Sequence, residues 1–153
     1  MFRQSGIWFY GLAGSGKTFA STLIADKLGN AFVIDGDEVR RHISFDLGYE
    51  KGDRLIQLQR VFGLAELVVR NNLYPVISTV TMNAKILECC NGLGLEVVQI
   101  VRPFDQLMLH RPSLYANSEN VVGKQIIQEK LNTKIINNDG STDFETLIVK
   151  SVE

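Results

Sequence analysis

The first residues with the types and spacing for chemistry occupy positions 11–18, which read Gly-Leu-Ala-Gly-Ser-Gly-Lys-Thr. This stretch matches the pattern G-x-x-x-x-G-K-[ST] at every fixed position. Glycines let backbone N–H groups surround phosphate oxygens, the lysine reaches the β- and γ-phosphates, and the threonine hydroxyl ligates Mg²⁺. The pattern therefore predicts a site for a nucleoside triphosphate such as ATP, with Mg²⁺, formed by Gly11, Ala13, Gly14, Ser15, Gly16, Lys17 and Thr18.

Acidic and basic side chains follow the second apolar run of the chain, where Asp35, Asp37 and Arg40 lie close together. Beside a magnesium triphosphate, one carboxylate can take the proton of an attacking hydroxyl and the other can support the metal. The alternative, which the residues alone leave equally open, is an Asp-Gly-Asp turn in which an aspartate caps a helix. Arg40 and Arg54 would suit an anionic acceptor.

Apolar runs alternate with helical periodicity along the chain, and these elements must position the chemistry. Strands are expected over 7–10, 31–34, 75–81, 95–101 and 134–136, and helices over 17–28, 53–72, 83–92, from Pro103 and over 142–152. Such alternation predicts one α/β domain over residues 1–153, with a five-stranded parallel sheet and helices on both faces. Ser78, Thr79 and Val80 then end the third strand beside the acceptor. Residues 111–132 lack a firm period and are expected to form a lid.

The composition limits the classes of partner. The chain has 153 residues, with 16 basic and 17 acidic side chains, so its net charge of −1 gives no general attraction to nucleic acid polymers or anionic membranes. No apolar run reaches the roughly 18 residues of a membrane span. Cys89 and Cys90 are adjacent and fit neither a disulfide framework nor a metal site. We therefore expect a cytoplasmic protein that binds small molecules.

Three segments in order, GLAGSGKT, VIDGDEVR and DLGYEKGDR, resemble the adenylylsulfate kinase family. The resemblance implies a phosphate-loop kinase fold that transfers the γ-phosphate of ATP to the 3′-hydroxyl of adenylylsulfate, and a possible homodimer. It implies that Asp37 is the general base and that Asp35 supports base and metal. It also implies that Arg40 and Arg54 hold the anionic group of the acceptor, and that Arg111 clamps ATP.

Some positions depart from the usual pattern of the family. Gln57 stands where the family usually has asparagine, and Thr79 and Val121 stand where it usually has phenylalanine. Gln57, Ser78, Thr79 and Val80 are nevertheless expected to contact the acceptor. In the family these two phenylalanine rings sandwich the adenine of the acceptor, so their absence leaves a smaller pyrimidine acceptor, cytidine diphosphoramidate of surface-polysaccharide biosynthesis, as an alternative. Two further alternatives are a nucleotide-binding regulator without transfer activity and a kinase for a non-nucleotide metabolite such as a sugar acid.

Overall fold

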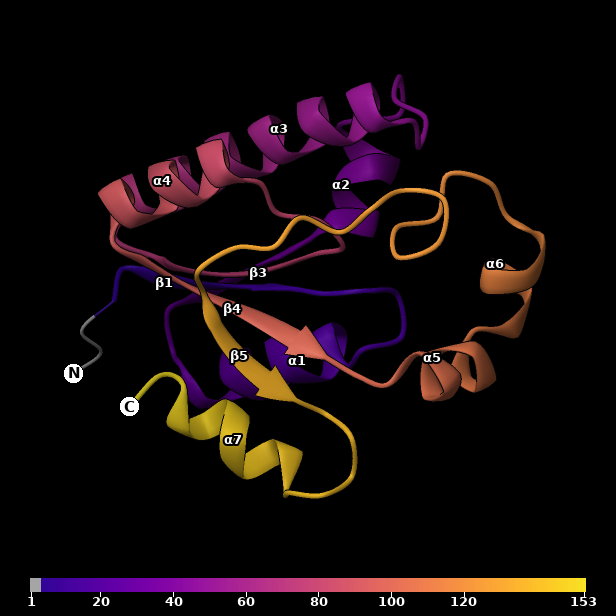
Figure 1. The fold of residues 1–153 in the computed structure, drawn as a ribbon. Coiled ribbons are helices and arrows are strands. Elements are labelled where there is room, and N and C mark those ends of the chain that lie inside the picture. The colour runs from indigo at the N-terminus through magenta and orange to yellow at the C-terminus, as the bar shows by residue number, and fades with distance from the viewer. Residues whose placement is uncertain (1–3) are drawn as a thin grey trace.

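The computed structural model describes residues 4–153 and shows a three-layer α/β fold (Figure 1). The strands are β1 (Gly6–Tyr10), β2 (Ala31–Asp35), β3 (Tyr74–Thr79), β4 (Leu95–Val101) and β5 (Lys134–Asn137). The helices are α1 (Lys17–Lys27), α2 (Gly36–His42), α3 (Lys51–Arg70), α4 (Ala84–Leu93), α5 (Phe104–His110), α6 (Pro112–Asn117) and α7 (Phe144–Lys150). The expected parallel sheet with helices on both faces is confirmed.

The sheet has the strand order β2-β3-β1-β4-β5, and every pairing in it is parallel. Strand β1 is buried on both faces because its side chains alternate between two apolar cores. Trp8 and Tyr10 belong to the core with residues of α3 and α4, while Ile7 and Phe9 belong to the core with residues of α1 and α7. Figure 1 shows α3 and α4 over one face and α1 and α7 over the other.

The carboxyl ends of all five strands meet at one edge of the sheet, because the strands are parallel. Strand β1 lies between β3 and β4, so the connections from β1 and β3 leave in opposite directions and open a crevice at this edge. The loop between β1 and α1 lies there, as do α2, α5 and α6 (Figure 1). The fold thus brings the segments after each strand to one place.

Most expected elements agree with the structure within a few residues, and the exceptions concern the site. Helix α2 was not expected as an element, and it begins directly after β2 because the Asp35 side chain caps it. Strand β3 ends at Thr79 rather than at residue 81, since the Thr79 hydroxyl donates to the Thr81 carbonyl 2.8 Å away and turns the chain.

The segment 111–132, expected as a lid, contains the short helix α6 followed by irregular backbone. Val121 and Val122 in this segment are buried, and Val121 packs with Leu107 and Tyr115 in a small third apolar cluster. The segment is thus attached to the fold through its own core, and its movement stays a prediction. Among the described residues, no helix is long and apolar enough to cross a membrane.

Candidate active site

The phosphate-binding loop wraps around the start of α1 in a conformation that requires glycine. Gly14 and Gly16 have φ angles of 87° and 111°, in the left-handed region that favours glycine. A Cβ on Gly14 would lie 3.2 Å from both Arg111 and His110, and a Cβ on Gly16 would lie 2.9 Å from the amide nitrogen of Asn138. The two glycines therefore serve both the turn and the close approach of neighbouring side chains.

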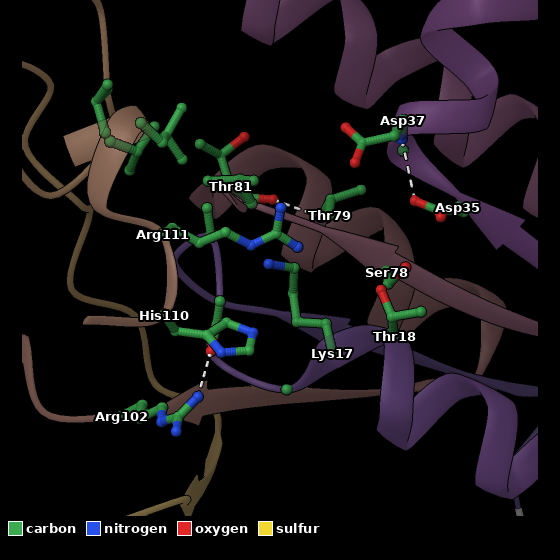
Figure 2. A pocket seen from close by; sticks show the side chains of 18 of the residues that line it. Lys17, Thr18, Asp35, Asp37, Ser78, Thr79, Thr81, Arg102, His110 and Arg111 are labelled. Atoms are coloured by element: carbon green, nitrogen blue, oxygen red, sulfur yellow. Dashed lines mark hydrogen bonds between the residues drawn. The ribbon is translucent and has the colours of Figure 1, made fainter. Parts of the chain in front are cut away.

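A cavity of about 920 Å³ opens beside this loop, and it collects most of the residues that the sequence indicated. The predicted residues that line it are Ala13, Gly14, Gly16, Lys17, Thr18, Asp35, Asp37, Arg40, Arg54, Gln57, Ser78, Thr79, Val80 and Arg111. Gly11 and Ser15, which were also predicted, are buried in the loop and do not line the cavity. Figure 2 shows Asp35 and Asp37 on one side of Lys17 and Arg102, His110 and Arg111 on the other.

Lys17 is turned back onto its own loop. Its Nζ donates to the carbonyl oxygen of Gly11 at 2.7 Å and to that of Leu12 at 3.2 Å. Burial lowers the pKa of Lys17 to about 8, and this effect exceeds the opposing attraction of Asp37 and Asp35. The ammonium group is therefore poorly solvated, and an anionic ligand beside it would favour the charged form.

Asp35 and Asp37 lie at the start of α2, at the carboxyl end of β2. The Asp35 carboxylate accepts a hydrogen bond from the backbone N–H of Asp37 at 3.0 Å, which makes it the N-cap of the helix. Burial raises the pKa of Asp35, and the nearby charge of Asp37 adds to this rise. The two readings left open by the sequence are therefore compatible, because the capping residue also lines the cavity.

Two arginines lie against one aromatic ring in the wall of the cavity. The Cζ atoms of Arg40 and Arg54 lie 4.3 and 5.5 Å from the ring centroid of Tyr49. Arg40 donates to the carbonyl of Gly48 at 2.6 Å, and Arg54 donates to that of Asn120 at 2.8 Å. Within residues 4–153, neither arginine forms an ion pair with a carboxylate. Burial and the charge of Arg40 lower the pKa of Arg54, so an anion here would relieve an unfavourable pair of like charges.

Two of the predicted acceptor residues have well-defined polar groups. The Gln57 amide donates to the carbonyl of Gly36 at 3.0 Å, whereas its buried Oε1 has no hydrogen-bond partner among the described residues. The hydroxyl of Thr79 is already engaged, because it accepts from the indole N–H of Trp8 at 2.7 Å and donates to Thr81. Gln57 therefore offers a free acceptor to a ligand, and Thr79 contributes mainly the shape of the wall.

Sequence reasoning missed several residues that line the cavity, including Tyr49, Arg102, His110 and Asn138. Tyr49 lies within the DLGYEKGDR segment that carried the resemblance, and its ring was the available signal for an aromatic residue near the acceptor. Thr79 and Val121 lack the rings that the family usually has at these positions, whereas Tyr49 places an aromatic ring in the cavity lining. Arg102 and Asn138 follow β4 and β5 directly, so their places at the ends of expected strands were the signal for them.

The three-layer fold and the loop at residues 11–18 are those of the phosphate-loop class of proteins. The family model for adenylylsulphate kinase matches residues 3–102, and the chain belongs to this family. An adenylyl-sulfate kinase of Picosynechococcus sp. (strain PCC 7002) is 30% identical over 121 residues, which are 76% of this chain and 64% of that protein. One from Synechococcus sp. (strain JA-3-3Ab) is 35% identical over 79 residues, 49% of this chain and 45% of that protein. The chain thus spans about half to two thirds of the length of these relatives.

A solved structure supports the fold assignment over nearly the whole chain. The APS kinase CysC of Mycobacterium tuberculosis, in complex with AMPPNP and APS, superposes with a TM-score of 0.84. The superposition covers 98% of this chain and 96% of that one at 22% sequence identity. At this identity the likeness establishes the fold, including the part after residue 102 that the family model does not match.

Proposed function

We propose that the chain is an ATP- and Mg²⁺-dependent kinase that transfers the γ-phosphate of ATP to the 3′-hydroxyl of adenylylsulfate. The observation that carries this proposal is the pair Arg40 and Arg54, which share the Tyr49 ring and lack carboxylate partners within residues 4–153. They line the same cavity as the phosphate loop and Asp37. Donor loop, base and anion-binding pair therefore occur together, as transfer between two nucleotides requires.

The donor would bind along the loop and the start of α1. Lys17 would leave the carbonyls of Gly11 and Leu12 and contact the β- and γ-phosphates. The Thr18 hydroxyl and the Asp35 carboxylate are oxygen donors of the kind that Mg²⁺ prefers, and both line the cavity. When bound, Mg²⁺ would neutralise charge on the transferred phosphoryl group. Arg111, the first residue of the segment 111–132, would contact the donor.

Asp37 would take the proton of the attacking hydroxyl, because its carboxylate lines the same cavity as the phosphate loop. The hydroxyl oxygen forms the new bond to the γ-phosphorus as the bond to the β-γ bridging oxygen breaks, so ADP leaves. The proton of the hydroxyl passes to the Asp37 carboxylate. Most of the rate would come from positioning and from charge neutralisation by Lys17 and the arginines.

The acceptor side suits a nucleotide with an anionic group. Arg40 and Arg54 would bind the charged phosphate-sulfate portion, because guanidinium groups pair well with such oxygens. The Tyr49 ring is half exposed and could stack on a base, an interaction that contributes roughly 1–3 kcal/mol per base. The partnerless Oε1 of Gln57 could accept from an amino or hydroxyl group. A regulator without transfer activity would need none of these groups.

A panel of acceptors tests the proposal. The protein is incubated with ATP and Mg²⁺ together with adenylylsulfate, cytidine diphosphoramidate, AMP or a sugar acid, and ADP release is followed. We expect fast, acceptor-dependent ADP release with adenylylsulfate and little above background with the others. Faster ADP release with cytidine diphosphoramidate would show that this compound, and not adenylylsulfate, is the acceptor. Slow hydrolysis with every compound would favour a regulator. The homodimer and the cytoplasmic location stay predictions.

A further inference from the structure

Three successive carbonyl oxygens of the phosphate loop accept hydrogen bonds from side chains outside the loop. The Tyr115 hydroxyl donates to Ala13 at 2.7 Å. Nη1 of Arg102 donates to Gly14 at 3.0 Å, and Nδ2 of Asn138 donates to Ser15 at 2.9 Å. Figure 2 shows the bond from Arg102. These three side chains come from three different segments, namely α6, the residue after β4 and the residue after β5.

Each of these bonds fixes the direction of one peptide group. In a trans peptide the carbonyl of one residue and the N–H of the next point in opposite directions. Holding the Ala13 carbonyl toward Tyr115 and the Ser15 carbonyl toward Asn138 therefore turns the N–H groups of Gly14 and Gly16 away from these two side chains. The N–H that follows the Gly14 carbonyl belongs to Ser15, and it donates to Leu12 at 3.0 Å, which closes a turn within the loop.

The remaining carbonyls of the loop are also occupied in this structure. Lys17 binds the Gly11 and Leu12 carbonyls, and Gly16 accepts from the backbone N–H of Ala20 at 3.0 Å. Only the Lys17 bonds must be released for Lys17 to reach a phosphate. The hydrogen bonds from Tyr115, Arg102 and Asn138 can persist when a donor binds. The loop then need not reorganise, which lowers the free-energy cost of binding.

We propose that Arg102, Tyr115 and Asn138 are positioning residues that hold the phosphate loop in its binding conformation before the donor arrives. The inference rests on the proposed function, because the loop must bind a nucleoside phosphate and the control readout uses adenylylsulfate. Because Tyr115 belongs to the segment 111–132, one of the three bonds also ties the expected lid directly to the loop. The lid segment thereby helps to set the donor site even without a ligand.

The sharpest variant is Tyr115→Phe, because it removes one hydroxyl and leaves the ring in its apolar cluster. The matched control is Tyr10→Phe, which removes the hydroxyl that lies 2.9 Å from Thr133 and outside the cavity lining. Calorimetry with MgADP as the probe should show a Kd about three- to tenfold higher for Tyr115→Phe. The control should match the wild type, and the KM for adenylylsulfate should change less than twofold in both.

A second pair of variants protects the test against a simple folding defect. Asn138→Ala should weaken MgADP binding by a similar factor. The matched control is Asn71→Ala, which removes the hydrogen bond from the Asn71 side chain to the Leu67 carbonyl at 2.8 Å at the end of α3 and should not weaken MgADP binding. Arg102→Lys should retain part of the affinity that Arg102→Ala loses, since an ammonium can still donate. A donor-specific loss of affinity at an unchanged unfolding temperature supports the proposal.

Unchanged MgADP affinity in the Tyr115, Asn138 and Arg102 variants would overturn the inference and leave the proposed function standing. An equal rise in the KM for adenylylsulfate together with a lower unfolding temperature would also overturn it, because that outcome indicates a general structural role. A wild-type protein that binds no MgADP would overturn both proposals. Absence of transfer to adenylylsulfate with MgADP binding retained would overturn the proposed acceptor alone.

Discussion

Nζ of Lys17 lies 2.7 Å from the carbonyl oxygen of Gly11, the first residue of the loop that it is expected to serve. The lysine is thus folded onto the loop, where burial lowers its pKa to about 8. A bound triphosphate would draw the ammonium off this carbonyl and raise its pKa again. Donor binding and the protonation of Lys17 are therefore linked.

This linkage predicts that donor affinity falls as the pH rises through about 8. Above that pH, free Lys17 is mostly neutral, so binding must take up a proton and MgADP affinity should fall up to about tenfold per pH unit. The measurement is calorimetry at pH 7, 8 and 9 in buffers of different ionisation enthalpy. A Lys17→Met variant should bind weakly and lose the pH dependence. Wild-type affinity that stays flat to pH 9 would contradict the linkage.

Replacement of the proposed base should separate chemistry from binding. Asp37→Asn keeps the shape of the side chain but removes its ability to take a proton, so turnover should fall about 10²- to 10⁴-fold. The Kd for MgADP should change only a few-fold, because the donor contacts the loop. Glu38→Gln is the matched control, since Glu38 is the next acidic residue of α2 and lies outside the cavity lining. Near-normal turnover of Asp37→Asn would rule out its role as the base.

The two roles of Asp35 can be distinguished by a pair of substitutions. Asp35→Asn retains an oxygen for the N–H of Asp37 and should leave stability nearly unchanged, whereas Asp35→Ala should cost about 1 kcal/mol. Both variants should need at least tenfold more Mg²⁺ for half-maximal rate, because each loses the carboxylate. Chemical unfolding and Mg²⁺ titration measure the two effects. A normal Mg²⁺ requirement in Asp35→Asn would exclude the metal-binding role and leave Asp35 only its role as the N-cap of α2.

The arginine pair should act on the acceptor and not on the donor. Arg54→Lys loses the planar fork and one of its contacts, so the KM for adenylylsulfate should rise about tenfold or more while the KM for ATP stays within twofold. Arg41→Lys serves as the control, because Arg41 is an exposed residue of α2 outside the cavity lining. Steady-state kinetics with each substrate varied measure the split. An increase in the KM for ATP alone would show that Arg54 binds the donor and not the acceptor.

Much of the candidate site could be predicted because its residues occur in short local motifs. Short segments that can be recognised from the sequence alone contain the loop at 11–18, the pair Asp35 and Asp37, and the two arginines. Their meeting in one cavity followed from the parallel sheet, since parallel strands end at the same edge. The same reasoning made the approximate position of residues 78–80 predictable.

The residues that brace the loop could not be predicted in this way. Arg102, Tyr115 and Asn138 are separated from their loop partners by 88, 102 and 123 positions. Arg102 and Asn138 stand at the ends of expected strands, but their bonds to the loop depend on the order β1-β4-β5 in the sheet, which no local pattern records. Tyr115 lies on α6 and reaches the loop through the packing of that helix with Leu107 and Val121. Tyr49 was missed for a different reason, because its role depends on Arg40 and Arg54 lying on its ring. Side-chain contacts of this kind appear only in the folded structure.

The most direct test of the proposed function is the identity of the reaction product. The protein is incubated with ATP, Mg²⁺ and adenylylsulfate, and the mixture is followed by ³¹P NMR. We expect one new phosphomonoester signal, assigned to the 3′-position of the acceptor, that grows in equal amount with ADP and is lost with Asp37→Asn. ADP formed together with inorganic phosphate, and no phosphomonoester, would contradict it.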